Sequence, residues 1–109
     1  MSLIREMKRK YLEYQFKRDK LNIIQEIPTD RFEYIIQTLI EQGWEIAAEY
    51  RHKDAWVLRW HGELRKGTSI LKCKWKKDEL GSIYGPERII KSIGDDFGFG
   101  IRTLPEWSH

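Results

Sequence analysis

Residues 44–76, WEIAAEYRHKDAWVLRWHGELRKGTSILKCKWK, give the strongest indication of the fold class. Apolar and polar side chains alternate along three short runs of this segment, and alternation with a period of two is typical of antiparallel strands that have one apolar face. The sequence therefore predicts three antiparallel strands with the tryptophans on the apolar face. The alternating positions are Ile46, Ala48 and Tyr50, then Trp56, Leu58 and Trp60, then Leu71, Cys73 and Trp75.

The pairing of these strands is predicted from their loops. A two-residue turn at Lys66-Gly67 and a three-residue loop from His52 to Asp54 keep the apolar faces of all three strands together. A slip of one residue would send every aromatic side chain to the wrong face. The expected opposite pairs are Trp60 with Cys73, Leu58 with Trp75, Tyr50 with Trp56, Ala48 with Leu58, and Ile46 with Trp60.

The residues before this segment predict a strand followed by a helix. The strand covers Leu21–Ile27 and Pro28 ends it. Asp30 and Glu33 have the spacing of a capping box, and Gly43 stands where a helix C′ glycine is expected. The helix is predicted at residues 31–42, from apolar side chains at helical spacing: Phe32, Ile35, Ile36, Leu39 and Ile40.

The N-terminal residues predict a basic amphipathic helix over residues 3–18. Arginines and lysines lie on the side away from an apolar stripe, which consists of Leu3, Ile4, Met7, Tyr11 and Tyr14. We expect this stripe to pack against the domain or against a second copy. A strand over Tyr11–Phe16 is the alternative, because aromatic residues favour strands.

The C-terminal residues predict another helix and a last strand. Gly85-Pro86 indicates a loop, with the proline at the first helical position and Gly94 at the end of the helix. Alternating apolar residues from Phe97 to Leu104 then predict a strand that Pro105 stops.

These elements predict an α+β fold, an antiparallel sheet of about four to five strands with two to three helices packed on one face, in the order α-β-α-β-β-β-α-β. We divide the chain into the basic N-terminal helix (1–20), a single α+β domain (21–104) and a C-terminal tail (105–109). The join between the second helix and its strand, IEQGWEI at residues 40–46, is similar to one in several small bacterial domains of unknown function. That likeness implies nothing about activity.

Charge is unevenly distributed along the 109 residues, although the net charge is only +3. Residues 1–20 and 51–78 are basic, with net charges of +4 and +6, while residues 21–50 and 79–109 are acidic, with −5 and −2. The sequence pI near 9.0 suggests anionic partners. No apolar run has the length of a transmembrane helix, and the one cysteine cannot form an internal disulfide, so we expect a cytoplasmic protein.

A basic surface is predicted on the sheet face opposite the tryptophans. In the expected register Arg59 lies directly opposite Lys74, and like charges opposed across strands are destabilising unless an anion or an acidic neighbour is present. Glu45, expected opposite His61, and Glu49, expected diagonal to Arg59, are the alternative source of that neutralisation. The candidate binding surface consists of Arg59, His61, Lys72, Lys74, Lys76 and Trp107.

The sequence predicts no metal site and no cofactor, because its histidines lack ligand spacing with one another or with Cys73. Cys73 shares the parity of the tryptophans and is expected in the core. Asp95 and Asp96 are expected in a polar turn among glycines.

The leading hypothesis is a small non-enzymatic binding or adaptor domain that recognises a protein partner, which includes a second copy of itself. The alternative is a nucleic-acid-binding module that uses the basic sheet face and the basic N-terminal helix. A third hypothesis is an enzyme with a site near Asp95, Asp96 and His61. The identity of a small-molecule ligand is not readable from the sequence.

Overall fold

The computed structural model describes residues 2–51, 59–76 and 79–105. It confirms the α+β class, with three helices and a five-stranded antiparallel sheet. The elements in chain order are α1 (Ser2–Arg18), β1 (Leu21–Ile27), α2 (Thr29–Glu41), β2 (Glu45–Arg51), β3 (Arg59–Lys66), β4 (Ser69–Lys76), β5 (Glu79–Pro86) and α3 (Glu87–Phe97).

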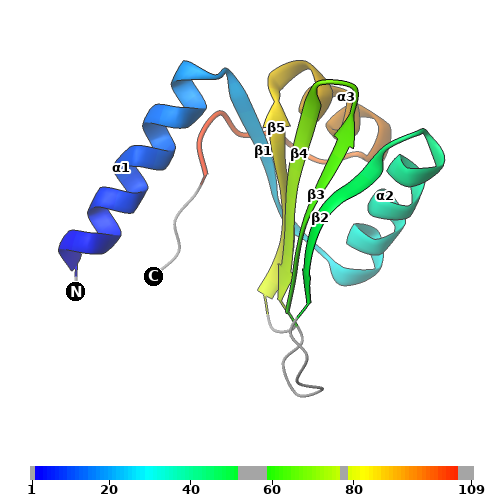
Figure 1. Cartoon of the computed structure of the whole chain (residues 1–109), viewed down its shortest axis with the longest axis horizontal. Coiled ribbons are helices and arrows are strands. Elements are labelled where there is room, and N and C mark those ends of the chain that lie inside the picture. The colour runs from blue at the N-terminus through cyan, green and yellow to red at the C-terminus, as the bar shows by residue number, and fades with distance from the viewer. Residues whose placement is uncertain (1, 52–58, 77–78, 106–109) are drawn as a thin grey trace.

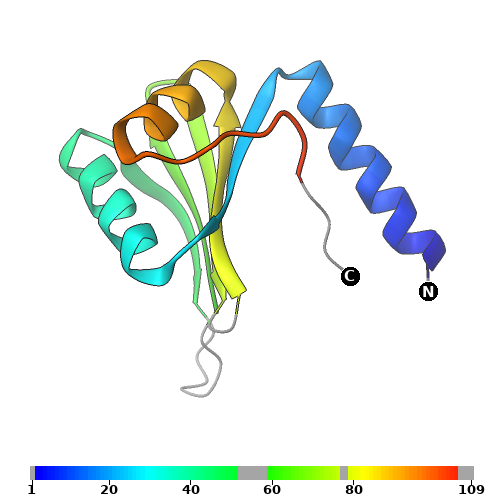
Figure 2. The same cartoon turned by 180° about the vertical axis from the view of Figure 1, so that it is seen from behind.

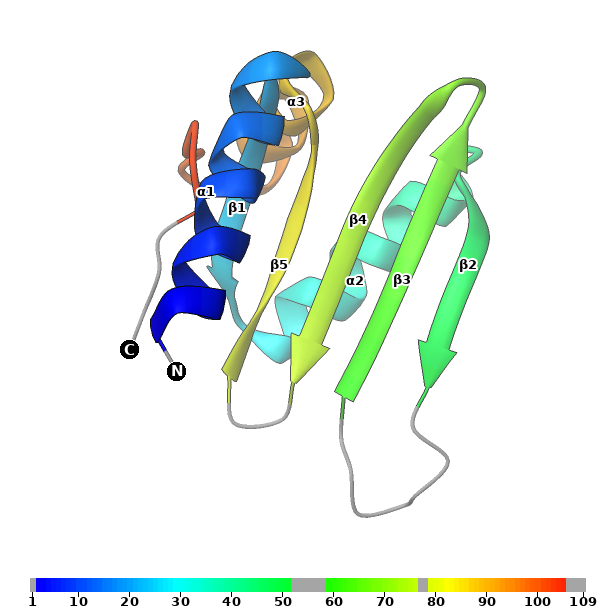
Figure 3. The ribbon, with the colours of Figure 1, turned by 60° about the vertical axis from the view of Figure 1, so that its left-hand side comes forward.

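The sheet has the strand order β1-β5-β4-β3-β2, so that β1 and β2 are its two edges. Helices α2 and α3 cover one face, and α1 lies on the opposite face over the β1 and β5 side (Figures 1 and 3). The reverse view shows the segment after α3 running beside β1 (Figure 2). Much of the face over β4, β3 and β2 is therefore left without a helix.

The core lies between the sheet and the α2–α3 layer, on the apolar face that the alternation predicts. Trp60 pairs with Trp75 in register on this face, and both indoles pack against the buried cluster. The Trp75 indole nitrogen also donates a hydrogen bond to the Thr29 hydroxyl at the start of α2, at 2.8 Å. Trp44 is buried as well, whereas Trp56 lies outside the described residues. The prediction that the tryptophans face the core is confirmed for Trp44, Trp60 and Trp75.

The predicted pairing of β3 with β4 was wrong by two residues. Lys66 pairs with Ser69, so Gly67 and Thr68 form the turn, and Trp60 lies opposite Trp75 instead of Cys73. Gly67 has a φ of +62°, a backbone conformation in which glycine has no Cβ clash. A shift of two residues leaves every side chain on its predicted face, which is why the alternation could not distinguish the two registers.

The predicted pairing of β2 was also wrong. Ile46 lies opposite Leu64 and Tyr50 opposite His61, because β3 runs on to Lys66 and β2 pairs with its later half. The register shifts between Ile46 and Ala48, which places Ala48 opposite Glu63. This irregularity moves Ala48 to the uncovered face and breaks the predicted shared face of the β2 apolar residues.

Strand β1 has the predicted bounds and contains a second irregularity. Its pairing with β5 shifts between Ile24 and Ile27, and Glu26 has a φ of +60°. Because of this shift Ile24 and Ile27 are both fully buried although they are three residues apart.

Helix α2 begins two residues earlier than predicted. Pro28 is the N-cap and no side chain caps the helix, so the capping-box prediction for Asp30 was wrong and this aspartate lies within the first turn. At the other end Gly43 has a φ of +103°, as expected of a glycine just after a helix.

Two predictions near the C-terminus are corrected. Gly94 lies inside α3, and the helix continues to Phe97 with Gly98 as its left-handed cap. A Cβ on Gly94 would lie 2.8 Å from the Phe99 carbonyl oxygen. The glycine therefore allows the segment after α3 to pack directly against the helix backbone. The fifth strand is β5, before α3, while the segment predicted as a last strand contributes one bridge, between Ile23 and Arg102.

Helix α1 is confirmed as a helix, but its apolar stripe does not pack on the domain. Phe16 is 1% exposed, whereas Met7, Tyr11 and Tyr14 of the stripe are 62%, 65% and 59% exposed. Of the two partners expected for the stripe, the domain is therefore wrong for Met7, Tyr11 and Tyr14, and a second copy stays a prediction. No helix within the described residues is long and apolar enough to cross a membrane.

Candidate functional site

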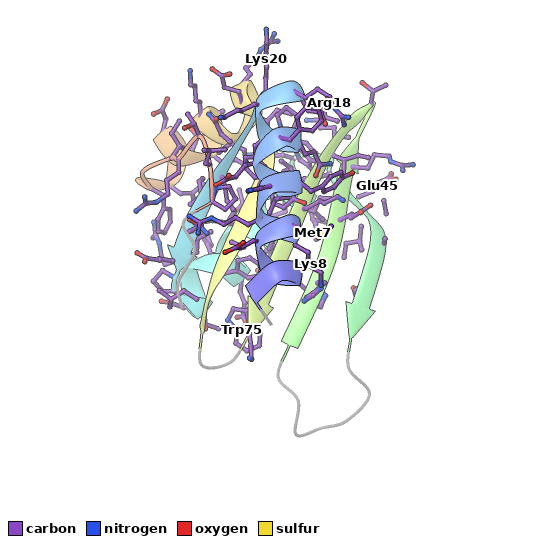
Figure 4. All side chains as sticks on the ribbon, turned by 90° about the vertical axis from the view of Figure 1, so that its left-hand side faces the viewer. Met7, Lys8, Arg18, Lys20, Glu45 and Trp75 are labelled. Carbon is purple, nitrogen blue, oxygen red and sulfur yellow. The ribbon has the colours of Figure 1, made fainter. Side chains whose placement is uncertain are left out.

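The uncovered face of the sheet is hollowed into a groove of about 430 Å³ between α1 and β2. Strands β3, β4 and β5 form its floor, Leu12 of α1 borders one side, and Ala48 and Glu49 of β2 border the other. Figure 4 shows α1 in front of this face, with Lys8 and Met7 toward its N-terminal end and Arg18 toward its C-terminal end. We call this hollow the sheet groove.

Both signs of charge line the sheet groove. Lys72 and Glu63 lie opposite each other on β4 and β3, and the Lys72 ammonium is 3.8 Å from a Glu63 carboxylate oxygen. Lys74 lies between His61 on β3 and Ser82 on β5. A lysine beside an imidazole and a hydroxyl can donate hydrogen bonds to a carboxylate, a phosphate or a backbone carbonyl of a ligand.

The groove also has an apolar side next to α1. The Tyr84 ring packs against the Phe16 ring, with centroids 5.0 Å apart and a tilt of 48°. Leu12, one helical turn before Phe16, is half-buried beside them. This side is well suited to the aliphatic part of a ligand, while the floor is suited to its polar groups.

Three of the predicted site residues, His61, Lys72 and Lys74, line the groove. Arg59 and Lys76 are opposite each other in the backbone register, at the end of the same two strands. The predicted opposition of Arg59 and Lys74 was wrong, because Lys74 faces His61. Trp107 lies outside the described residues.

The predicted neutralising acids are placed differently. Glu45 lies opposite Arg65 instead of His61, and Glu49 lies opposite Gly62 at the border of the groove. The pairing of Glu63 with Lys72 was missed because the predicted register, two residues out, placed Glu63 opposite Ile70. Ser82 and Tyr84 were missed because β5 was not predicted. The alternation of Glu63 and Arg65 with Leu64 was the available sign that Glu63 lies on the face opposite Leu64.

Cys73 belongs to the core, as predicted. Its side chain is 3% exposed, and burial raises the pKa of the Cys73 thiol to about 12. A neutral, buried thiol is neither a good nucleophile nor a good metal ligand. Cys73 therefore contributes packing to the sheet beneath the groove.

Asp95, Asp96 and His61 do not form one site. The two aspartates lie on α3, which covers one face of the sheet, while His61 lines the groove on the other face. Asp96 borders a separate hollow of about 410 Å³ between α2, α3 and the turn after β3. The predicted polar turn at Asp95-Asp96 was wrong, because both residues are helical.

Across residues 2–51, 59–76 and 79–105 no group of three or more histidine, cysteine, aspartate or glutamate side chains has the arrangement of a metal site. Comparisons of the chain with protein-family models, with curated proteins and with solved structures gave no match.

Proposed function

We propose that this chain is a small non-enzymatic recognition domain that binds an extended segment of a protein partner in the sheet groove. The groove is the observation that carries the proposal, because it lies on the face that the helices leave uncovered and combines charges of both signs with an apolar border. The partner segment is expected to place carboxylates near Lys74 and a cation near Glu63.

The mixed lining favours a peptide over a nucleic acid. A phosphate backbone repeats a single sign of charge, so it gains from lysines and is repelled by carboxylates. Glu63 lines the groove and already engages Lys72. A peptide with acidic and basic side chains can satisfy both signs, which is the electrostatic complementarity that determines specificity and register in protein recognition.

The experiment selects peptides from a phage-displayed random library on the immobilised full chain and measures the affinity of the selected peptides by isothermal titration calorimetry. Lys74→Glu is the test variant. Arg88→Glu on α3 is the matched control, because it makes the same charge change on the other face. We expect peptides that contain both acidic and basic residues. Lys74→Glu should weaken their binding by at least about tenfold, as expected when a charge-assisted hydrogen bond is lost, while Arg88→Glu should bind normally.

Two results would overturn the proposal. One is a selection that yields no peptide dependent on Lys74. The other is tighter binding of a labelled oligothymidylate at low salt that Lys74→Glu abolishes, since that result assigns the groove to single-stranded nucleic acid.

A further inference from the structure

Helix α1 carries an exposed surface on which no other described helix or strand packs. Met7, Tyr11 and Tyr14 are spaced i, i+4 and i+7, so they form one line along the helix. All three are more than half exposed, while Phe16, on the side of the helix that faces Tyr84, is buried. We call Met7, Tyr11 and Tyr14 the outer stripe.

Positive charge accompanies the outer stripe. Helix α1 holds six basic and two acidic residues. Glu13 is within 3.5 Å of Arg9, and the Arg18 guanidinium, which also pairs with Asp19 at 3.0 Å, lies 5.5 Å from the centre of the Tyr14 ring.

Lys10 and Lys17 are exposed and, at helical periodicity, border the stripe on one side. Glu6 and Glu13 stand one helical turn before Lys10 and Lys17, so the surface is a short apolar line bordered by more cations than acids.

The position of α1 makes the outer stripe accessible to a flat surface. The helix forms one side of the molecule in Figures 1 and 2, and none of the drawn strands or the other helices lies beyond it on that side. A plane can therefore contact α1 along its length while the sheet groove, on the inner side of the helix, stays accessible.

We propose that the outer stripe of α1 binds the surface of a lipid bilayer that contains anionic headgroups. Tyrosine is favoured at the boundary between headgroups and acyl chains, and helices that lie in this boundary combine an apolar line with lysines and arginines. Pairing of the stripe with that of a second copy is less favourable, because each α1 holds six basic residues against two acidic ones and two copies would bring like charges together.

The experiment is co-sedimentation of the full chain with vesicles of phosphatidylcholine, or of phosphatidylcholine and phosphatidylglycerol, at low and high salt. We expect binding to the mixed vesicles that decreases as salt increases, because exposed charges are screened. Lys10→Gln with Lys17→Gln should weaken the partition coefficient by about twenty-fivefold, at about fivefold for each cation. Arg88→Gln with Lys91→Gln on α3 is the charge-matched control and should bind like the original chain.

A second pair of variants tests the apolar line. Tyr11→Gln with Tyr14→Gln should abolish sedimentation with the mixed vesicles, whereas Tyr34→Gln, which alters a tyrosine that is 57% exposed on α2, should not. These side chains are exposed, so circular dichroism should show folded protein in every case.

Three results would overturn the inference. They are no sedimentation with mixed vesicles at low salt, equal binding by the Tyr11 and Tyr14 variant, and a dimer in the absence of lipid that this variant dissociates. The last result assigns the stripe to a second copy. Peptide binding in the sheet groove is measured without vesicles, so either proposal can fail while the other stands.

Discussion

At the scale of single residues, Gly81 on β5 determines how closely α2 approaches the sheet. A Cβ at this position would lie 2.4 Å from a ring carbon of Phe32, which is 4% exposed in the core. Gly81→Ala must displace the ring, and we expect it to lower the free energy of unfolding by about 1–3 kcal/mol, the usual effect of overpacking. Urea unfolding followed by tryptophan fluorescence measures this change.

Gly100→Ala is the control for that measurement. A Cβ there would have no neighbour within 4 Å among the described residues, so a change within about 0.5 kcal/mol is expected. Equal losses for Gly81→Ala and Gly100→Ala would contradict the close approach of Phe32.

Cys73 is predicted to make stability depend on alkaline pH. Its pKa is raised by burial from 9.0 to about 12, so between these values the unfolded chain loses the thiol proton and the folded chain keeps it. Rising pH therefore favours unfolding, by up to about 1.4 kcal/mol per pH unit from this group. Lysines and tyrosines titrate in the same range, so the comparison with Cys73→Ala isolates the thiol.

We expect the stability difference between the original chain and Cys73→Ala to shrink as the pH rises above about 9, in urea unfolding at several pH values. A difference that is constant with pH would show that the thiol is accessible to water in the folded state.

At the scale of elements, local patterns predicted what depends on near neighbours in the chain. The period of α2 and the alternation in β4 need only a helix axis or a pleated strand, and both elements were found. The alternation also placed Lys72 and Lys74 on the correct face. It could not determine their partners across the sheet, because registers two residues apart preserve the face of every side chain.

Strand β5 was missed because its sequence, ELGSIYGP, has the composition of a loop. The two glycines are needed for tertiary reasons. A Cβ on Gly81 would meet Phe32, and one on Gly85 would lie 2.6 Å from a Leu71 methyl carbon. The backbone of β5 thus leaves room for side chains from α2 and β4. The pattern of apolar residues along β5 itself does not show that these side chains come so close. Tyr84 and Ser82 of the groove were missed with β5.

The outer edge of β2 is predicted to be protected by its charges. Antiparallel pairing with the β2 of a second copy about Ala47 would place Glu45 opposite Glu49, and like charges directly opposite are destabilising. Glu45→Thr with Glu49→Thr removes this repulsion and introduces strand-favouring residues. We expect the variant to form dimers or larger species at concentrations where the original chain does not.

Light scattering after size-exclusion chromatography measures the mass. Glu33→Thr with Glu41→Thr on α2 makes the same charge change away from the edge and should leave the mass unchanged. If all three proteins have one mass at every concentration, the acids do not protect the edge.

At the scale of the whole molecule, the two proposed surfaces follow from where α1 lies. Helices α2 and α3 complete the core on one face, so α1 is not needed to cover that core. Its inner side, with Leu12, borders the sheet groove, and its outer stripe faces away from the sheet. A chain docked on a membrane through α1 would therefore keep the groove accessible to a protein partner.

This division predicts that the two halves of α1 contribute unequally to stability. Phe16 is 1% exposed and packs on Tyr84, so Phe16→Ala should lower the free energy of unfolding by about 3–5 kcal/mol. Met7 and Tyr11 of the first half are 62% and 65% exposed, so Met7→Ala with Tyr11→Ala should unfold within about 1 kcal/mol of the original chain. Urea unfolding compares the three proteins. If Met7→Ala with Tyr11→Ala destabilises the chain as much as Phe16→Ala does, the outer stripe has a role within the fold, and the bilayer proposal loses its basis.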